Sequence, residues 1–535
     1  MKTNILLHVS RISFGPRNSE FGFLSAFDLR PSDFSFGLAA SCSLGSMLRH
    51  AASLAGALLL LAGCTMAPKY ARPAAPIPPA WPSGPAYAQA GTTNVPAVPD
   101  LRWQEFFTDQ KLRQVIGTAL TNNRDLRVAT LNVERARALY RIQRAELLPT
   151  VNGTAAYGKQ RVPSEVMGFN QPLTIEAYDA NLGVASWELD FFGRIRSLED
   201  RALEEYFATE QARRSAQIML VSSVANAYLA LAADRENLKL SETTRDAQQA
   251  AYDLVKRRYE LGLATELDLF RAQTPLDVAR RDIALYTQQV AKDENALNLL
   301  VGSPTASDWT GLSAELSGVA PPKEISAGIS SEVLLRRPDV LEAESLLKAA
   351  NADIGAARAA FFPRISLTAA FGTASSDLSG LFKTGSQAWN YAPQIVMPIF
   401  DARTWSANKT AKVQREIAVT QYEKAIQNAF REVADALAVR GTVDREVAAQ
   451  QSLVNASAET YRLANSRYDK GIDNYLGVLD AQRSLFAAQQ ALVLLRLEKV
   501  ASRVRLYAVL GGGWQTQESA SVTGRSGSAP EQSRN

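Results

Sequence analysis

The sequence predicts a mainly helical protein with a membrane β-barrel portion, built from two copies of one structural unit. The first observation is an internal repeat, because the pattern of residues 252–302 recurs at 461–511, 209 residues further on. The second is a pair of long runs, 194–261 and 403–470, that are rich in helix formers and contain a single glycine and no proline. The third is a set of four short segments in which apolar and polar residues alternate, as they do in β-strands.

The composition excludes several classes of function. The chain has 535 residues, of which 46% are hydrophobic and 21% are charged, close to the average of globular proteins. Its net charge of +4 is small and no basic tract stands out, so we expect no nucleic-acid partner. Both histidines and both cysteines lie at or before residue 64. The body therefore lacks the usual acid–base, thiol and zinc-binding groups, and we expect no enzyme, no metal site and no cofactor.

Residues 1–63 are interpreted as a signal region whose true start is Met47. Arg49 and His50 precede an apolar stretch at 51–62, which is too short to span a bilayer permanently. The motif Leu-Ala-Gly-Cys then ends at Cys64, where a bacterial lipoprotein would be cleaved and lipidated. We expect a covalent lipid on Cys64, the alternative being an ordinary signal with a chance cysteine. Residues 64–100 form a Pro/Ala-rich lipidated linker.

Residues 101–320 make up the first repeat. A helix is predicted from about 109 to 147, because Pro149 prevents another turn. A β-hairpin at about 149–190 follows, with a polar loop at 159–177. The long helical run ends at Gly262, and the chain returns in a helix over about 265–301 that Pro275 kinks or interrupts.

Residues 321–513 make up the second repeat, which follows the same order. A helix over about 338–362 leads to a hairpin at about 363–400, with a polar loop at 373–388. The second long run breaks at Gly471, and a return helix covers about 475–510. Residues 514–535 are rich in Ser, Gly and Gln and are expected to be disordered.

The four strands have the length and pattern of transmembrane barrel strands. Each has about 8–11 residues with aromatics near its ends, and one face is apolar while the other is polar. The alternative is a pair of half-buried hairpins of a soluble protein, which alternation alone does not exclude. The residues that we expect to face lipid are Val151, Tyr157, Leu182, Val184, Ile365, Leu367, Phe371, Tyr391 and Ile395.

Four strands cannot close a barrel, so the sequence predicts that copies of the chain share one. An open sheet edge in lipid leaves unpaired backbone groups that cost several kcal/mol each, and small barrels need about eight strands. Two copies would give eight strands and a filled interior, whereas three would give twelve and a lumen. The long helices also predict assembly of several copies, because a helix of about 100 Å needs lateral support from neighbouring helices.

Several stretches of the chain resemble the TolC-like outer-membrane efflux proteins, in particular the lipoprotein branch (NodT-like) that serves multidrug pumps of the RND type. These stretches are CTMAPKYARP at 64–73, WELDFFGR at 187–194, LLRRPD at 334–339, ARAAFFP at 357–363, and RY at 467–468 followed by Gly471 and YLGVLDAQR at 475–483. The resemblance extends from about residue 64 to residue 513.

The resemblance implies a homotrimer with a twelve-stranded β-barrel in the outer-membrane lipid and a twelve-helix α-barrel across the periplasm. Its implied partners are a periplasmic adaptor protein and an inner-membrane efflux transporter. The chain would then be a lipid-anchored, passive, gated exit duct for drugs or other small toxic compounds in a Gram-negative outer membrane. The alternatives are a duct for type I protein secretion or metal-ion export and, in a different class, a non-porous periplasmic coiled-coil scaffold lipoprotein.

Two sets of working residues are expected at the turns between long and return helices. Asp473, with Asp469 one turn earlier, is the candidate gate, because a trimer would make each a ring of three carboxylates that favours cations. The alternative for Asp473 is a solvated turn residue or a helix cap. The candidate adaptor-docking residues are Tyr259, Gly262, Leu263, Tyr468, Gly471 and Ile472. Turn geometry alone is the alternative reason for the two glycines.

Overall fold

The computed structural model describes residues 65–87, 101–163, 172–302, 315–325 and 330–514. All of the described residues belong to one compact unit, residues 63–535. The predicted signal region, Cys64 and the tail after Trp514 therefore lie outside the described residues.

Both halves of the chain contain the same succession of elements. The first half consists of α2 (Trp103–Phe106), α3 (Gln110–Asn122), α4 (Arg124–Ala145), β1 (Val151–Val162), β2 (Leu173–Leu189), α6 (Arg194–Glu260) and α7 (Glu266–Val301). The second half consists of the short 3₁₀ turns η3 (Leu316–Gly318) and η4 (Ser331–Arg336), then α8 (Pro338–Ala359), β3 (Arg364–Ser375), η5 (Leu378–Gly380), β4 (Gln387–Val396), α9 (Ala402–Asp469) and α10 (Tyr475–Val509). A helix, a hairpin, a very long helix and a return helix thus occur twice.

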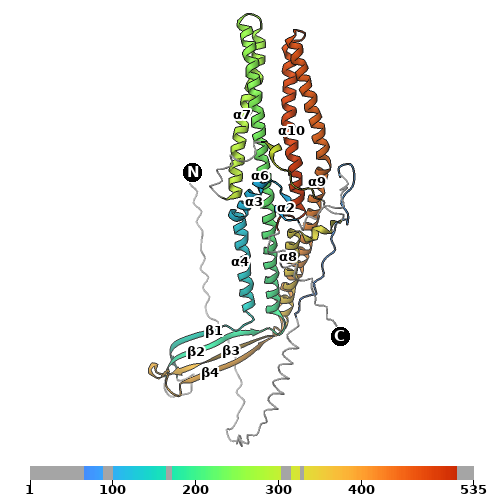
Figure 1. Ribbon diagram of the computed structural model, residues 1–535. Coiled ribbons are helices and arrows are strands. Elements are labelled where there is room, and N and C mark those ends of the chain that lie inside the picture. Colours follow the sequence, from blue (N-terminus) through green and yellow to red (C-terminus); the bar gives the residue numbers. More distant parts are fainter. Residues whose placement is uncertain (1–64, 88–100, 164–171, 303–314, 326–329, 515–535) are drawn as a thin grey trace, which may run out of the picture. The chain divides into compact units, whose positions relative to one another are not determined.

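The two very long helices are present as predicted. Helix α6 has 67 residues and α9 has 68, so each extends for about 100 Å. Helix α6 lies against α7 and α8, and α9 lies against α10 (Figure 1). Among the described residues, α6 also holds the one stretch that is apolar enough to cross a membrane, but 56% of that stretch is buried inside the protein. This burial is typical of a core helix.

The helix predicted over 109–147 is wrong in one respect, because it is broken at Asn123. The Asn123 side chain accepts a hydrogen bond from the Leu126 N–H at 2.9 Å and so caps α4. Its amide nitrogen donates to the Leu300 carbonyl, also at 2.9 Å. The break thus depends on a partner at the far end of α7.

Two other expectations differ from the structure. Helix α7 continues through Pro275, so the predicted interruption is wrong, whereas a kink at Pro275 stays a prediction. Packing along α6 compensates for the hydrogen bond that proline removes. The strands of the first hairpin also extend into the predicted loop, where Lys159 and Glu176 face each other and form an ion pair. Polar residues can thus continue a strand when they pair across it.

The four strands form a single antiparallel sheet in the order β1-β2-β3-β4 (Figure 1). The central contact joins β2 of the first repeat to β3 of the second. A bulge interrupts this contact, since Val184 pairs with Ala369 and Trp187 with Leu367. Ser186, inside the bulge, has a φ of 53°. Strands β1 and β4 are the edges, and neither outer edge pairs with another described strand.

A buried core joins both repeats to the start of the body. Phe106 of α2 stacks on Tyr507 of α10, with ring centroids 4.0 Å apart and planes 8° apart. The Tyr507 hydroxyl donates to the Leu101 carbonyl at 2.7 Å, so its polar end is satisfied. Residues of α3, α6, α8 and α9 complete this core. This core thus packs the start of the body against helices of both repeats, at a level between the sheet and the helical turns.

Candidate functional site

The register of the sheet places the nine residues predicted to face lipid on one face. Directly paired residues of an antiparallel sheet project to the same side. Leu182 pairs with Gly153 on one side and with Phe371 on the other. The bulge at Ser186 shifts the alternation by one residue, so that Trp187 joins the same face. The set on this face comprises Val151, Tyr157, Leu182, Val184, Ile365, Leu367, Phe371, Tyr391 and Ile395.

This apolar face is uncovered by the described residues. Leu182 and Phe371 are both 62% exposed, and Tyr391 is 63% exposed. A contiguous apolar surface of this kind marks contact with lipid or another molecule. The opposite face carries mostly small or polar side chains, among them Asn152, Thr154, Asn181, Thr368 and Gln394.

The apolar face ends in an aromatic pair followed by charges. The rings of Tyr157 and Tyr178 lie 4.6 Å apart on adjacent strands. Two residues further along, Lys159 forms its ion pair with Glu176. Tyrosines followed by charged groups are typical of the boundary between lipid and water. That this face meets lipid stays a prediction.

Asp473, the predicted gate residue, forms an ion pair within its own chain. Arg467 Nη2 donates to Asp473 Oδ1 at 3.1 Å across the turn. This hydrogen bond holds the pKa of the Asp473 carboxyl below its usual range. The side chain of Asp469, the last residue of α9, makes no hydrogen bond or ion pair with any described residue. Arg467 was not among the predicted site residues, although an arginine just before the Gly471 turn was a visible signal.

The two turns that carry the predicted docking residues have the same backbone. Gly262 has a φ of 75° and Gly471 a φ of 70°, a left-handed conformation that favours glycine. The Leu263 N–H donates to the Arg258 carbonyl at 2.7 Å, and the Ile472 N–H donates to the Arg467 carbonyl at 2.9 Å. Leu263, Ile472 and Tyr259 are exposed. The turns thus present apolar side chains to solvent, and their docking role stays a prediction.

A contact between Arg258 and Tyr468 ties the two helical turns together. Arg258 Nη1 donates to the Tyr468 hydroxyl at 2.5 Å, and the guanidinium lies 5.7 Å from the centroid of that ring. Arg258 and Arg467 occupy the same place in the two repeats. The first repeat has Ala264 where the second has Asp473. Arg258 therefore lacks the equivalent of the carboxylate that pairs with Arg467, and it binds the other hairpin instead.

The segment that follows Cys64 is held against the helices near the sheet. Thr65 Oγ1 lies 3.2 Å from Ser197 Oγ, at the start of α6. Arg358, in the last turn of α8, donates to the Met66 carbonyl at 3.3 Å, and Asn351 Nδ2 donates to the Pro68 carbonyl at 2.7 Å. Since β2 leads into α6 and α8 leads into β3, Thr65 is fixed where the strands leave the helices.

We expect Gly355→Ala to displace this segment. A Cβ at residue 355 would lie 2.8 Å from the Ala67 nitrogen and 2.5 Å from Ser197 Oγ, both too close. The predicted loss of stability is about 1–3 kcal/mol, together with faster tryptic cleavage after Lys69. Thermal unfolding and limited proteolysis measure both effects.

Gly477→Ala is the matched control, because no atom lies within 4 Å of a Cβ at that helical position. It is expected to stabilise the protein by about 0.5–1 kcal/mol. Equal cleavage rates in the two variants would contradict the packing of residues 65–73 on α8.

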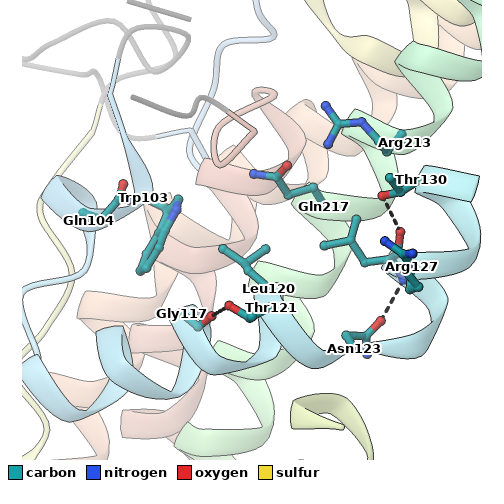
Figure 2. A pocket seen from close by; sticks show the side chains of 11 residues that line it. Trp103, Gln104, Gly117, Leu120, Thr121, Asn123, Arg127, Thr130, Arg213 and Gln217 are labelled. Atoms are coloured by element: carbon teal, nitrogen blue, oxygen red, sulfur yellow. Dashed lines mark hydrogen bonds between the residues drawn. The ribbon is translucent and has the colours of Figure 1, made fainter. Parts of the chain in front are cut away.

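A pocket of about 440 Å³ opens beside the break between α3 and α4 (Figure 2). Figure 2 shows Trp103 at one side of the pocket and Arg127 and Arg213 at the other. Its lining consists of Trp103, Gln104, Gly117, Leu120, Thr121, Asn123, Leu126, Arg127, Thr130, Arg213 and Gln217. This lining has two cations and no carboxylate, so it lacks a paired acid and base. None of these residues was predicted as a site.

Comparison with known proteins agrees with this geometry. The model of the outer membrane efflux protein family matches residues 115–303 and 329–512. The toluene efflux pump outer membrane protein TtgC and the antibiotic efflux pump outer membrane protein ArpC, both of Pseudomonas putida, are each 47% identical over 473 residues, which is 88% of this chain and 97% of theirs. The open state of the Neisseria gonorrhoeae MtrE outer membrane channel superimposes with a TM-score of 0.76 at 36% identity, covering 84% of this chain and 99% of that one. The chain therefore belongs to the outer membrane efflux protein family and is the outer-membrane channel component of a tripartite efflux pump.

Proposed function

We propose that three copies of the chain assemble into a channel with a shared twelve-stranded barrel. The observation that carries this proposal is a four-stranded sheet with two open edges and one uncovered apolar face. Pairing β4 of one copy with β1 of the next would satisfy both edges, as a membrane barrel requires. Two copies would give only eight strands and a filled interior, whereas a duct needs a lumen.

The polar face of the sheet would line that lumen, and the paired long helices would continue the wall into the periplasm. Gly262 and Gly471 reverse the chain at the far ends of α6 and α9, about 100 Å from the sheet. Their exposed apolar neighbours suit a periplasmic adaptor, which would in turn connect to the inner-membrane transporter. The channel itself would be passive, and small toxic compounds such as organic solvents and antibiotics are its proposed cargo, by likeness to TtgC and ArpC.

A lipid on Cys64 would add an anchor beside the barrel. Thr65 is held at the start of α6, directly after the sheet, so a lipid on the preceding residue would be close to the membrane surface. Several acyl chains on one cysteine would anchor the chain firmly, whereas one chain binds only marginally. Mass spectrometry of the amino-terminal peptide tests this modification directly.

The experiment for the channel is planar-bilayer recording of the purified full-length protein, with its mass measured in detergent. We expect a trimer and stepwise conductance. A monomer with complete strand pairing would contradict the shared barrel. A trimer that stays silent even with the Arg258→Ala substitution would favour the scaffold interpretation.

The ion selectivity of the same channel tests whether Asp473, at the Gly471 turn, lies at its narrowing. Arg467→Ala leaves Asp473 without its partner and adds a net negative charge per copy, so preference for cations should rise. Asp473→Asn leaves Arg467 unpaired, so preference for cations should fall. Each change in the permeability ratio is expected to be on the order of two- to fivefold, measured from the reversal potential in a salt gradient. Unchanged reversal potentials in both variants would show that the narrowing lies elsewhere.

A further inference from the structure

In the second repeat, a segment from the start of the chain packs along helices α8 and α9. The Tyr70 hydroxyl donates to Glu344 Oε1 of α8 at 3.2 Å, and Arg72 Nε donates to the same oxygen at 3.1 Å. Trp81 stacks on Phe430 of α9, with ring centroids 5.3 Å apart. This segment therefore binds α8 and α9 together, and an arginine of the segment neutralises an acid of the helix.

The pocket of Figure 2 occupies the corresponding place in the first repeat, beside α4 and α6. Equivalent residues of α4 and α8 stand 214 positions apart, so Thr130 of the pocket corresponds to Glu344. Equivalent residues of α6 and α9 stand 209 positions apart, so Arg213 corresponds to Tyr422. Tyr422 is fully buried, whereas Arg213 borders a pocket of about 440 Å³. The described residues thus cover this place in one repeat and leave it open in the other.

The pocket carries positive charge that no described residue neutralises. Its lining includes the guanidinium groups of Arg127 and Arg213, and neither forms a hydrogen bond or an ion pair with a described residue. Of the nearby acids, Glu210 is bound by a tyrosine of its own helix, Asp109 caps α3, and exposed Asp125 does not line the pocket. A segment that fits this pocket should therefore bring a carboxylate. This is the reverse of the second repeat, where the helix supplies the acid.

The described chain ends at the edge of this pocket. Gln217, which lines the pocket, donates from Nε2 to the Gly513 carbonyl at 3.1 Å. The Arg214 guanidinium lies 4.6 Å from the centroid of the Trp514 ring, and Arg214 is the neighbour of Arg213 in the chain. Between Gly513 and Trp514 the backbone therefore advances one turn of α6 towards the start of that helix. The rest of the chain continues from beside the two arginines of the pocket.

The tail has an acid at a suitable distance from Trp514. Glu518 is the first acid after Trp514 and the one charged residue between positions 515 and 524. Four residues of extended chain span at most about 13–14 Å. Arg213 is next to the residue that Trp514 contacts, so the Glu518 carboxylate can reach its guanidinium.

We propose that residues 515–520 of the tail dock in this pocket, with the Glu518 carboxylate between Arg127 and Arg213. The carboxylate would accept charge-assisted hydrogen bonds from both guanidinium groups. The docked tail would bind α4 to α6, as the segment from Tyr70 to Trp81 binds α8 to α9. The disorder predicted for the tail would then apply to the residues beyond the pocket.

The test is hydrogen exchange of the purified full-length protein, measured by mass spectrometry on peptides that cover residues 515–522 and 526–535. We expect amides of the first peptide to exchange about tenfold more slowly than those of the second, after correction for sequence. Glu518→Gln should remove most of this difference, and it should fold as the wild type does because residue 518 is not part of the described core. Glu531→Gln removes the next acid of the tail and is the matched control, which should leave the difference unchanged.

Substitutions in the pocket test the same contact from the other side. The double variant Arg127→Gln/Arg213→Gln should speed exchange of residues 515–522 as much as Glu518→Gln does. Adding Glu518→Gln to it should have no further effect, because the contact is already lost. Arg141→Gln removes an exposed arginine of α4 that does not line the pocket, so it should exchange as the wild type does.

Equal exchange of the two peptides in the wild type would overturn the proposal. So would slow exchange of residues 515–522 that survives both Glu518→Gln and the double arginine variant. A pocket filled by a neighbouring copy would leave residues 515–522 exchanging fast in every variant, which would also contradict docking of the tail. Channel conductance is a separate readout, so failure of this proposal leaves the proposed duct intact.

Discussion

Leu182→Arg is expected to abolish assembly of the channel in the outer membrane. Leu182 is in the middle of the apolar face, paired with Gly153 and Phe371, and is largely exposed. An arginine facing the centre of a bilayer costs about 2–4 kcal/mol, and a trimer would contain three of them, about 6–12 kcal/mol in all. That is comparable to the whole stability of many proteins. The measurement is the amount of trimer in outer-membrane fractions, separated by non-denaturing electrophoresis.

Thr154→Arg is the matched control. Thr154 pairs with Asn181, next to Leu182, but its side chain projects to the polar face. If that face lines the lumen, the variant should assemble normally and conduct with a lower preference for cations. If Leu182→Arg assembled into trimers normally and Thr154→Arg did not, the lipid-facing and lumen-facing sides of the sheet would be the reverse of those assigned here.

The faces of this sheet were predictable from alternation, but the bulge inside β2 was not. Alternation in β2 is regular up to Val184 and resumes at Trp187, so a prediction from period two ends the strand near residue 185. The structure continues the strand to Leu189, because the bulge at Ser186 absorbs one residue and returns the apolar side chains to their face. The spacing from Val184 to Trp187 was the signal of this shift.

The other features that the sequence did not predict depend on contacts between residues that are far apart in the chain. The long helices follow from runs without helix breakers, and the turns follow from Gly262 and Gly471. The break at Asn123 depends on the Leu300 carbonyl, 177 residues away. Likewise, the repeat reveals that Arg258 and Arg467 are equivalent, but not that they bind different partners.

Arg258→Ala is expected to loosen the periplasmic turns and raise the open probability of the channel. The contact of Arg258 with Tyr468 is the one hydrogen bond between the two helical turns in the described residues. One exposed charged hydrogen bond with a cation–π contact contributes about 1 kcal/mol. Three copies contribute about 3 kcal/mol, which changes an open-to-closed ratio by about a hundredfold. Single-channel recording in planar bilayers measures this ratio.

Two further substitutions separate the contact from a general loss of charge. Tyr468→Phe removes the hydroxyl and keeps the ring, so its effect should be smaller than that of Arg258→Ala. Arg257→Ala removes the same charge one residue earlier, and its side chain makes no hydrogen bond or ion pair with a described residue, so it should gate as the wild type does. If Arg257→Ala opens the channel as much as Arg258→Ala, local positive charge would control opening. The specific tie between the hairpins would then have no part in the gate.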